Sequence, residues 1–157
     1  MDLTRTAIAA AGAAAFLIAA PAAAALGGTA DSVQADAVAL KTQAAPRAAG
    51  QAAYTVQRLS LDNGTVVDEY LSSAGAAPGT VFALSWKGPR QPDLAQLLGS
   101  YYGEYQAAYA QPHVHTNHVR IEGANLRYSA GGHMRAYWGS AYAPALLPAG
   151  LSTGELK

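Results

Sequence analysis

The hydrophobic pattern of residues 31–51 predicts one helix followed by an irregular connection. Val33, Ala37 and Leu40 recur at helical spacing within Asp31–Lys41, which has an acid near its start and a base at its end. We therefore expect a short amphipathic helix. Thr42–Gln51 shows no period and contains proline and glycine, which predicts an exposed connection.

The next pattern is typical of a β-hairpin. Two segments rich in β-branched and aromatic residues, Tyr54–Leu61 and Thr65–Leu71, flank the dipeptide Asn63-Gly64. Asn-Gly favours hairpin turns because both residues tolerate a positive φ. We therefore expect two antiparallel strands joined at this turn.

A third strand is predicted over Val81–Lys87. Side chains alternate between the two faces of a strand, so Phe82, Leu84 and Trp86 are expected on one face, which we assign to the core.

A longer helix is predicted to start at Pro92, with Asp93 at its positively polarised N-terminal end. Its apolar stripe has a period near 3.6 and consists of Leu94, Leu97, Leu98, Tyr101, Tyr105 and Ala108. Gly99 and Gly103 interrupt this segment and mark either a close approach to a strand or a weak point.

A second hairpin is expected near the C-terminus, with strands Leu126–Ala130 and His133–Trp138 joined by Gly131-Gly132. The following tail, rich in Ala, Pro and Leu, shows no period and is expected along the surface. The predicted fold class is α+β: a single domain in which a three-stranded meander and a C-terminal hairpin form an antiparallel sheet with two helices packed on it.

The first 25 residues are typical of a secretory signal peptide. Arg5 supplies the positive region, Ala7–Ala20 forms an uncharged stretch, and Ala23-Ala24-Ala25 offers a small-x-small cleavage site. The prediction is cleavage before Leu26, a signal peptide over 1–25, a mature domain over 26–157, and a periplasmic or secreted product. The alternative is an uncleaved membrane anchor, which the alanine-rich, weakly apolar composition of the segment disfavours.

Composition narrows the classes of function. The formal net charge is zero, so no net field attracts nucleic acid or anionic lipid. We expect the chain to contact the membrane only through its signal peptide, before cleavage. The chain has no cysteine, which removes disulfides, thiol chemistry and cysteine-type zinc sites.

Several separated motifs occur together in order along the chain: Val81–Pro89, Pro92–Leu94, Leu97–Gly99 and Gly131–Tyr137. With these motifs the chain resembles an uncharacterised family of exported proteobacterial proteins, domain of unknown function 2844. The resemblance covers nearly all of the predicted mature chain. It implies export and a shared fold, and it supplies no activity, substrate or catalytic residue.

Three histidines suggest a metal site. His113, His115 and His118 form a His-x-His-x-x-His pattern, and imidazoles two residues apart on an extended chain point to the same side. This arrangement suits Zn or Cu. The alternative is a solvated polar loop.

The second hairpin suggests a site for a polar ligand. With a turn at Gly131-Gly132, one face carries Tyr128, His133, Arg135 and Tyr137, whose donors suit a carboxylate, a phosphate or a polar peptide group. The other face carries Met134, Ala136 and Trp138, which we assign to the core. The alternative is that Arg135 pairs with an acid elsewhere and the tyrosines only pack.

Tyrosines on the long helix suggest a partner surface. Tyr102 and Tyr109 lie off the leucine stripe, and tyrosine is favoured at protein interfaces. The alternative is that they form the edge of the core.

No catalytic residue is nominated. Asp68 and Glu69 are adjacent on a strand and point to opposite faces, so they do not form a carboxylate pair. The leading hypothesis is a non-enzymatic periplasmic interaction or ligand-binding module, whose partner is a periplasmic protein or a small polar ligand. The alternatives are a metal-binding protein using the histidine segment and an enzyme with a dispersed site near His133.

Overall fold

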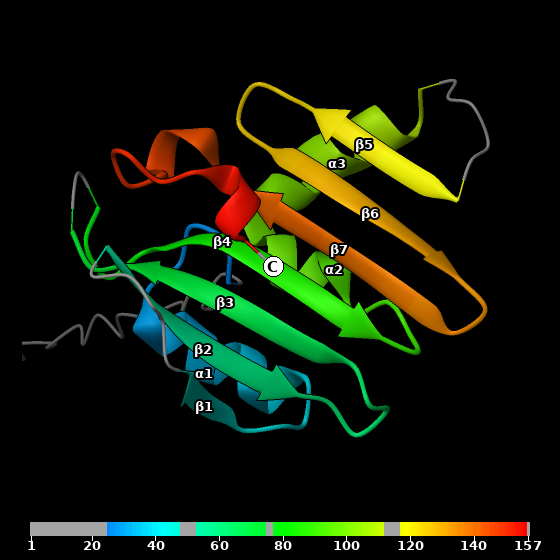
Figure 1. The fold of residues 1–157 in the computed structure, drawn as a ribbon, viewed down its shortest axis with the longest axis horizontal. Helices are drawn as coiled ribbons and strands as arrows, with labels where there is room; N and C mark the ends of the chain where they lie inside the picture. Colours follow the sequence, from blue (N-terminus) through cyan, green and yellow to red (C-terminus); the bar gives the residue numbers. More distant parts are fainter. Residues whose placement is uncertain (1–24, 48–52, 75–76, 112–116, 157) are drawn as a thin grey trace, which may run out of the picture.

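The computed structural model describes residues 25–47, 53–74, 77–111 and 117–156. In this part of the chain, seven strands form one antiparallel sheet in the order β1-β2-β3-β4-β7-β6-β5 (Figure 1). The strands are β1 (Ala44–Arg47), β2 (Tyr54–Ser60), β3 (Val66–Ser72), β4 (Val81–Gly88), β5 (His118–Glu122), β6 (Arg127–His133) and β7 (Ala136–Tyr142). Two meanders, β1–β4 and β5–β7, therefore join along the pair of β4 and β7.

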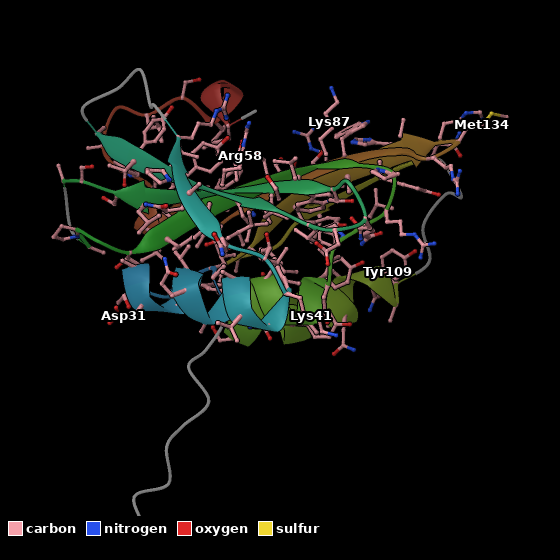
Figure 2. The ribbon with its side chains drawn as sticks, turned by 90° about the horizontal axis from the view of Figure 1, so that it is seen from below. Asp31, Lys41, Arg58, Lys87, Tyr109 and Met134 are labelled. Atoms are coloured by element: carbon pink, nitrogen blue, oxygen red, sulfur yellow. The ribbon has the colours of Figure 1, made fainter. Side chains whose placement is uncertain are left out.

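The helices lie together on one face of this sheet, and Figure 2 shows them on a single side. They are α1 (Ala30–Ala39), α2 (Leu94–Leu98) and α3 (Tyr102–Tyr109), with the 3₁₀ turn η1 (Gly99–Tyr101) between the last two. The predicted α+β single domain with an antiparallel sheet is confirmed. The predicted strand count was too low.

The main core lies between the helices and the sheet. Val33 and Ala37 of α1 and Leu97 of α2 are buried there, together with Leu84 and Trp86 of β4. Burying a large apolar side chain contributes about 1.5–3 kcal/mol relative to leaving it exposed. The helical periods predicted from the sequence thus mark the residues that hold the helices on the sheet.

Both strands missed by the prediction lie at the edges of the sheet. β1 pairs only with β2 and β5 only with β6. The segment predicted as an exposed connection contains β1, where Pro46 is tolerated because an edge strand does not need every N–H. Most side chains of β1 and β5 are exposed, so hydrophobic alternation is weak there.

The long predicted helix is divided at Gly99. Its φ is 49°, in the left-handed region that glycine adopts without steric cost. Asp93 caps α2 by accepting hydrogen bonds from the backbone N–H groups of Ala95 at 2.9 Å and Gln96 at 3.1 Å. Gly99 is therefore the predicted weak point, and the leucines before it remain buried.

A bulge changes the predicted faces of β4. The register passes from Tyr70 opposite Ala83 to Leu71 opposite Val81, so Phe82 is an extra residue. Phe82 turns away from the helices and packs against Tyr54, with ring centroids 6.0 Å apart. The prediction that Phe82 shares a face with Leu84 and Trp86 was wrong.

The C-terminal hairpin turns later than predicted. His133 pairs with Ala136, so the turn consists of Met134 and Arg135, with φ values of 46° and 67°. Gly131 and Gly132 remain inside β6, opposite Trp138 and Tyr137. A Cβ at Gly131 would lie 2.8 Å from the indole of Trp138, and one at Gly132 would lie 2.4 Å from the Tyr137 ring. These glycines therefore make room for rings on β7.

The C-terminal tail covers one end of the face opposite the helices (Figure 1). Its leucines pack against a second cluster of buried residues, and Leu156 is only 7% exposed. That cluster consists of Tyr54, Val56, Tyr70, Phe82, Ala83 and Leu156. The sheet is thus covered by helices on one side and by the tail at one end of the other.

The turn at Met134-Arg135 generates a stability prediction. Positive φ at two non-glycine residues is costly, whereas Asn-Gly prefers such a turn. We expect Met134→Asn with Arg135→Gly to raise the free energy of unfolding by about 1 kcal/mol in urea titrations.

Gly132→Ala is the matched control and should lower the free energy of unfolding, because its Cβ would lie 2.9 Å from the Tyr137 backbone. A loss of stability with the Asn-Gly turn would contradict the turn assignment.

Candidate functional site

The uncovered part of the face opposite the helices contains a groove of about 570 Å³. Alternation along the strands brings its side chains together from β1, β2, β3, β4 and β7, and the tail closes one end with Leu156. The polar and aromatic residues that line it are Arg47, Arg58, Asp68, Ser85, Trp86, Lys87, Trp138 and Ser140. Figure 2 shows Arg58 and Lys87 on the side away from the helices.

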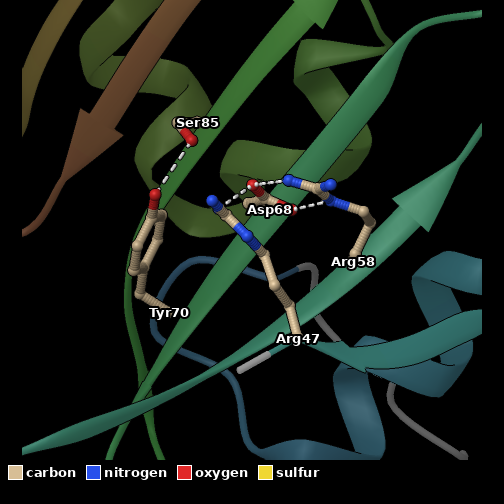
Figure 3. Close-up of polar contacts among 5 residues, drawn as sticks. All are labelled: Arg47, Arg58, Asp68, Tyr70 and Ser85. Atoms are coloured by element: carbon tan, nitrogen blue, oxygen red, sulfur yellow. Dashed lines mark hydrogen bonds and ion pairs between the residues drawn. The ribbon is translucent and has the colours of Figure 1, made fainter. Parts of the chain in front are cut away.

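Two arginines bind one carboxylate at this groove (Figure 3). Arg58 donates from Nε to Asp68 Oδ1 and from Nη2 to Oδ2, both at 2.7 Å. Arg47 donates from Nη1 to Oδ2, also at 2.7 Å. The Asp68 side chain is 7% exposed, whereas those of Arg47 and Arg58 are 43% and 39% exposed. The two guanidinium groups carry two positive charges and Asp68 carries one negative charge, so a net positive charge faces the groove.

The strand register explains this arrangement. Arg58 is directly opposite Asp68 across β2 and β3. Arg47 comes from β1, which pairs with the other edge of β2. The hydrogen bonds that Arg58 donates to the Asp68 carboxylate raise the pKa of Arg58 further above its usual range. Arg58 therefore stays charged at any physiological pH.

A further cation and an exposed indole complete the groove. Lys87 lies between Val66 of β3 and Trp138 of β7 in the register, and its side chain is exposed. Trp138 is 45% exposed, and the ring of His118 lies 5.4 Å from it. The missing side chain of Gly131 lets the indole lie close to β6. Trp138 thus offers an exposed ring beside Lys87, in the groove that the two arginines also line.

Small hydroxyl side chains form the middle of the groove. Ser85 of β4 and Ser140 of β7 are directly opposite each other. The Ser85 hydroxyl lies 3.2 Å from the Tyr70 hydroxyl, and burial raises the pKa of Tyr70 (Figure 3). Tyr70 therefore stays a neutral phenol, and the serines leave space for a ligand between the cations and the indole.

The charge continues across the same face into a smaller hollow of about 130 Å³, which shares Ser140 with the groove. Its lining includes Arg120, Glu122 and Arg127. Arg120 Nε and Glu122 Oε1 form an exposed ion pair of 3.0 Å. The two hollows together are lined by the basic residues Arg47, Arg58, Lys87, Arg120 and Arg127 and by the acids Asp68 and Glu122. This face is therefore locally basic in a chain of zero net charge.

The four residues predicted for a polar ligand are not brought together on one face. Tyr128 and Tyr137 point to the helix side, where both line a hollow of about 170 Å³ beside α3. His133 is exposed at the end of β6, on the other face. Arg135 lies in the turn and lines a separate hollow with Arg90. The cause is the later turn, which also places Trp138 on the open face instead of the predicted core.

The helix tyrosines form a stack that reaches the sheet. Tyr102 and Tyr109 stack on Tyr105 with centroid distances of 5.7 and 5.6 Å, and Tyr105 packs on Tyr128 at 4.9 Å. Tyr109 is 46% exposed and Tyr102 is half-buried. Both residues therefore take part in packing, and their predicted role at a partner surface stays a prediction.

The metal and enzyme hypotheses receive no added support. His118 is exposed on β5, and its Nε2 lies 3.0 Å from Ser129 Oγ; His113 and His115 lie outside the described residues. Within those residues, no three His, Cys, Asp or Glu side chains gather as metal ligands. No ion pair joins an acid to His133 in the same part of the chain.

The pairing of Arg58 with Asp68 in the groove could have been predicted from the sequence. A three-residue loop at Asp62-Asn63-Gly64 brings Leu61 opposite Thr65, and counting back along both strands pairs Arg58 with Asp68. Arg47 carried no such signal because β1 was not predicted. Asp68 and Glu69 do point to opposite faces, as expected.

The fold and the groove define an α+β protein with helices on one face of an antiparallel sheet and a basic groove on the other. The chain belongs to the family DUF2844, described as a protein of unknown function, whose family model matches residues 22–156. Searches of curated proteins and of solved structures each return no match. The family resemblance found in the sequence is thereby confirmed, and the groove has to be interpreted from its own chemistry.

The arginine pair generates a stability prediction. Asp68→Asn leaves two guanidinium groups together without their counter-charge, so we expect a loss of about 1–3 kcal/mol in the free energy of unfolding. Added phosphate should recover part of this loss, because an anion can replace the carboxylate between the arginines. Urea titrations with and without phosphate measure both effects.

Glu122→Gln is the matched control, since it breaks an exposed ion pair and should cost less than about 1 kcal/mol. Equal losses in the two variants would show that Asp68 has no special role.

Proposed function

We propose that the mature chain is a non-enzymatic, exported binding module, and that its groove holds a small organic anion carrying a carboxylate and a flat ring. The observation that supports this most is the excess of positive charge around Asp68, where one carboxylate pairs with two half-exposed guanidinium groups. A ligand carboxylate would supply the second negative charge.

The geometry of the arginines supports a planar acidic group. Guanidinium donors form a rigid fork that matches a carboxylate, and Arg58 already uses this fork on Asp68 through Nε and Nη2. Arg47 donates to Asp68 through Nη1 alone. Its remaining donors, with the ammonium of Lys87, are available for a ligand at the groove.

The size and lining of the groove support the ring. About 570 Å³ lies within the usual range of small-molecule sites, which is roughly 300–1,000 Å³. Trp138 presents an exposed indole face, and Ser85 and Ser140 supply hydroxyls that orient polar substituents. A ring on the indole and a carboxylate at the arginines would occupy both ends of the groove.

The character of these groups supports binding over catalysis. Guanidinium and ammonium groups hold an anion through fixed positive charge and do not exchange protons near neutral pH. The proposed location is the periplasm, on the basis of the signal pattern over residues 1–25. No helix within the described ranges is long and apolar enough to cross a membrane.

Titration calorimetry with benzoate, glucuronate and neutral glucose tests this proposal. We expect both carboxylates to bind, glucose to bind much more weakly, and affinity to fall with added salt. Arg47→Ala removes the donors that Asp68 does not use and should weaken carboxylate binding by about tenfold or more, since each 1.4 kcal/mol is a factor of ten.

Trp138→Ala should weaken benzoate binding more than acetate binding, because only benzoate has a ring to stack. Arg135→Ala is the matched control and should leave affinity unchanged, because Arg135 lies outside the groove. Carboxylate binding that is equal in Arg47→Ala and the wild type would refute the site.

A further inference from the structure

Two buried acids on the helix side lack the partners that such groups require. Asp36 of α1 and Glu69 of β3 are each 0% exposed. Within the described residues, Asp36 Oδ2 and both carboxylate oxygens of Glu69 accept no hydrogen bond. Buried carboxylates are normally paired with cations or hydrogen-bond donors, because burial of an isolated charge is very costly. These atoms therefore indicate a missing positive group.

In the part of the chain that the structure describes, no ion pair joins a basic side chain to either acid. Gln57 of β2 and Leu84 of β4 are opposite Glu69 in the register, and Gln96 of α2 donates its hydrogen bond to Asp36 Oδ1. Burial raises the pKa of Glu69 to about 8, and the charge of Asp36 contributes to this rise. Burial also raises the pKa of Asp36, although Gln96 and the Ala25 backbone N–H oppose the change.

The chain is anchored beside this pair from Ala25 onward. Ala25 is 0% exposed and Leu26 2%. The Leu26 N–H donates to Leu97 O at 3.1 Å, and the Gly28 N–H donates to Ala25 O at 3.1 Å. The backbone nitrogen of Ala25 is the group that interacts with the Asp36 carboxylate. This nitrogen is therefore already at the Asp36 carboxylate, which in turn interacts electrostatically with Glu69.

We propose that the chain is processed between Ala24 and Ala25, and that the new α-ammonium of Ala25 is the counter-ion of the Asp36–Glu69 pair. Hydrolysis by signal peptidase adds water across this peptide bond. Ala24 leaves with a new carboxylate, and Ala25 keeps its nitrogen, which becomes an ammonium group. One amide donor is replaced by three donors and a full positive charge at the same atom. The proposal is independent of the ligand groove.

The sequence permits this cut as well as the one predicted before Leu26. Small residues at Ala22 and Ala24 have the same small-x-small spacing as Ala23 and Ala25. A cut after Ala25 would remove a fully buried residue together with the carbonyl that Gly28 binds. The packing therefore favours the earlier of the two cuts.

The intact mass of the exported protein tests the cut directly. The full chain is expressed in a bacterium, recovered from the periplasmic fraction and measured by mass spectrometry. The expected product starts at Ala25. A product that starts at Leu26 or elsewhere, or that keeps residues 1–24, would overturn the proposal.

The reactivity of the α-amine tests the ion pair in the processed protein. A free α-amine has a pKa of about 8, and two carboxylates should raise it by about one unit or more. At pH 8, acylation of the Ala25 amine should therefore be several-fold slower in the wild type than in Asp36→Asn with Glu69→Gln, as measured by peptide mass spectrometry.

Asp31→Asn, on the exposed side of the same helix, is the control and should acylate like the wild type. If the double variant fails to fold, Glu69→Gln alone provides the comparison and should show a smaller increase. Equal acylation rates in all variants would overturn the ion pair even if the chain starts at Ala25. These acylation rates do not depend on the groove, so a failure of the carboxylate-binding experiments would not change them.

Discussion

The alternation of side chains along β3 is the constraint on which both sites depend. Asp68 and Glu69 are neighbours in the chain, yet one lies in the open groove and the other lies under the helices. The helices pack over the core on one face of the sheet, whereas the tail covers only one end of the other face. One acid therefore meets arginines at a half-exposed surface, and the other needs its partner in the interior.

Glycines opposite aromatic residues determine where the two indoles lie. A Cβ at Gly139 would lie 2.1 Å from the Trp86 ring on the helix side, and a Cβ at Gly131 would lie 2.8 Å from the Trp138 ring on the open side. Each of these glycines thus allows a tryptophan ring to lie directly against the strand that contains the glycine. Trp86 packs on Tyr128 within the core, while Trp138 remains accessible beside the cations.

The same glycines explain why part of the site was not predictable. Gly131-Gly132 has the composition of a hairpin turn, but its role is to accommodate rings from β7, and the turn falls at Met134-Arg135. Trp138 was consequently assigned to the core. Arg47 was missed because β1 is an exposed edge strand with almost no alternation.

Elements with strong local signals were predicted well. Asn63-Gly64 marked the first hairpin, and the leucine spacing marked the helix that packs on the sheet. The bulge at Phe82 had no local signal, because it arises from pairing between two strands. The features that could not be predicted are therefore those set by the register between distant strands and by exposed edge strands.

A two-dimensional NMR titration of the protein with benzoate, observing the indole N–H groups and the arginine Nε–H groups, is the most direct test of the groove. We expect the signals of Trp138 and Arg47 to move together and to saturate at one benzoate concentration, while the signal of buried Trp86 moves little. Saturable shifts confined to other residues, or no saturable shift at Arg47, would refute the binding site.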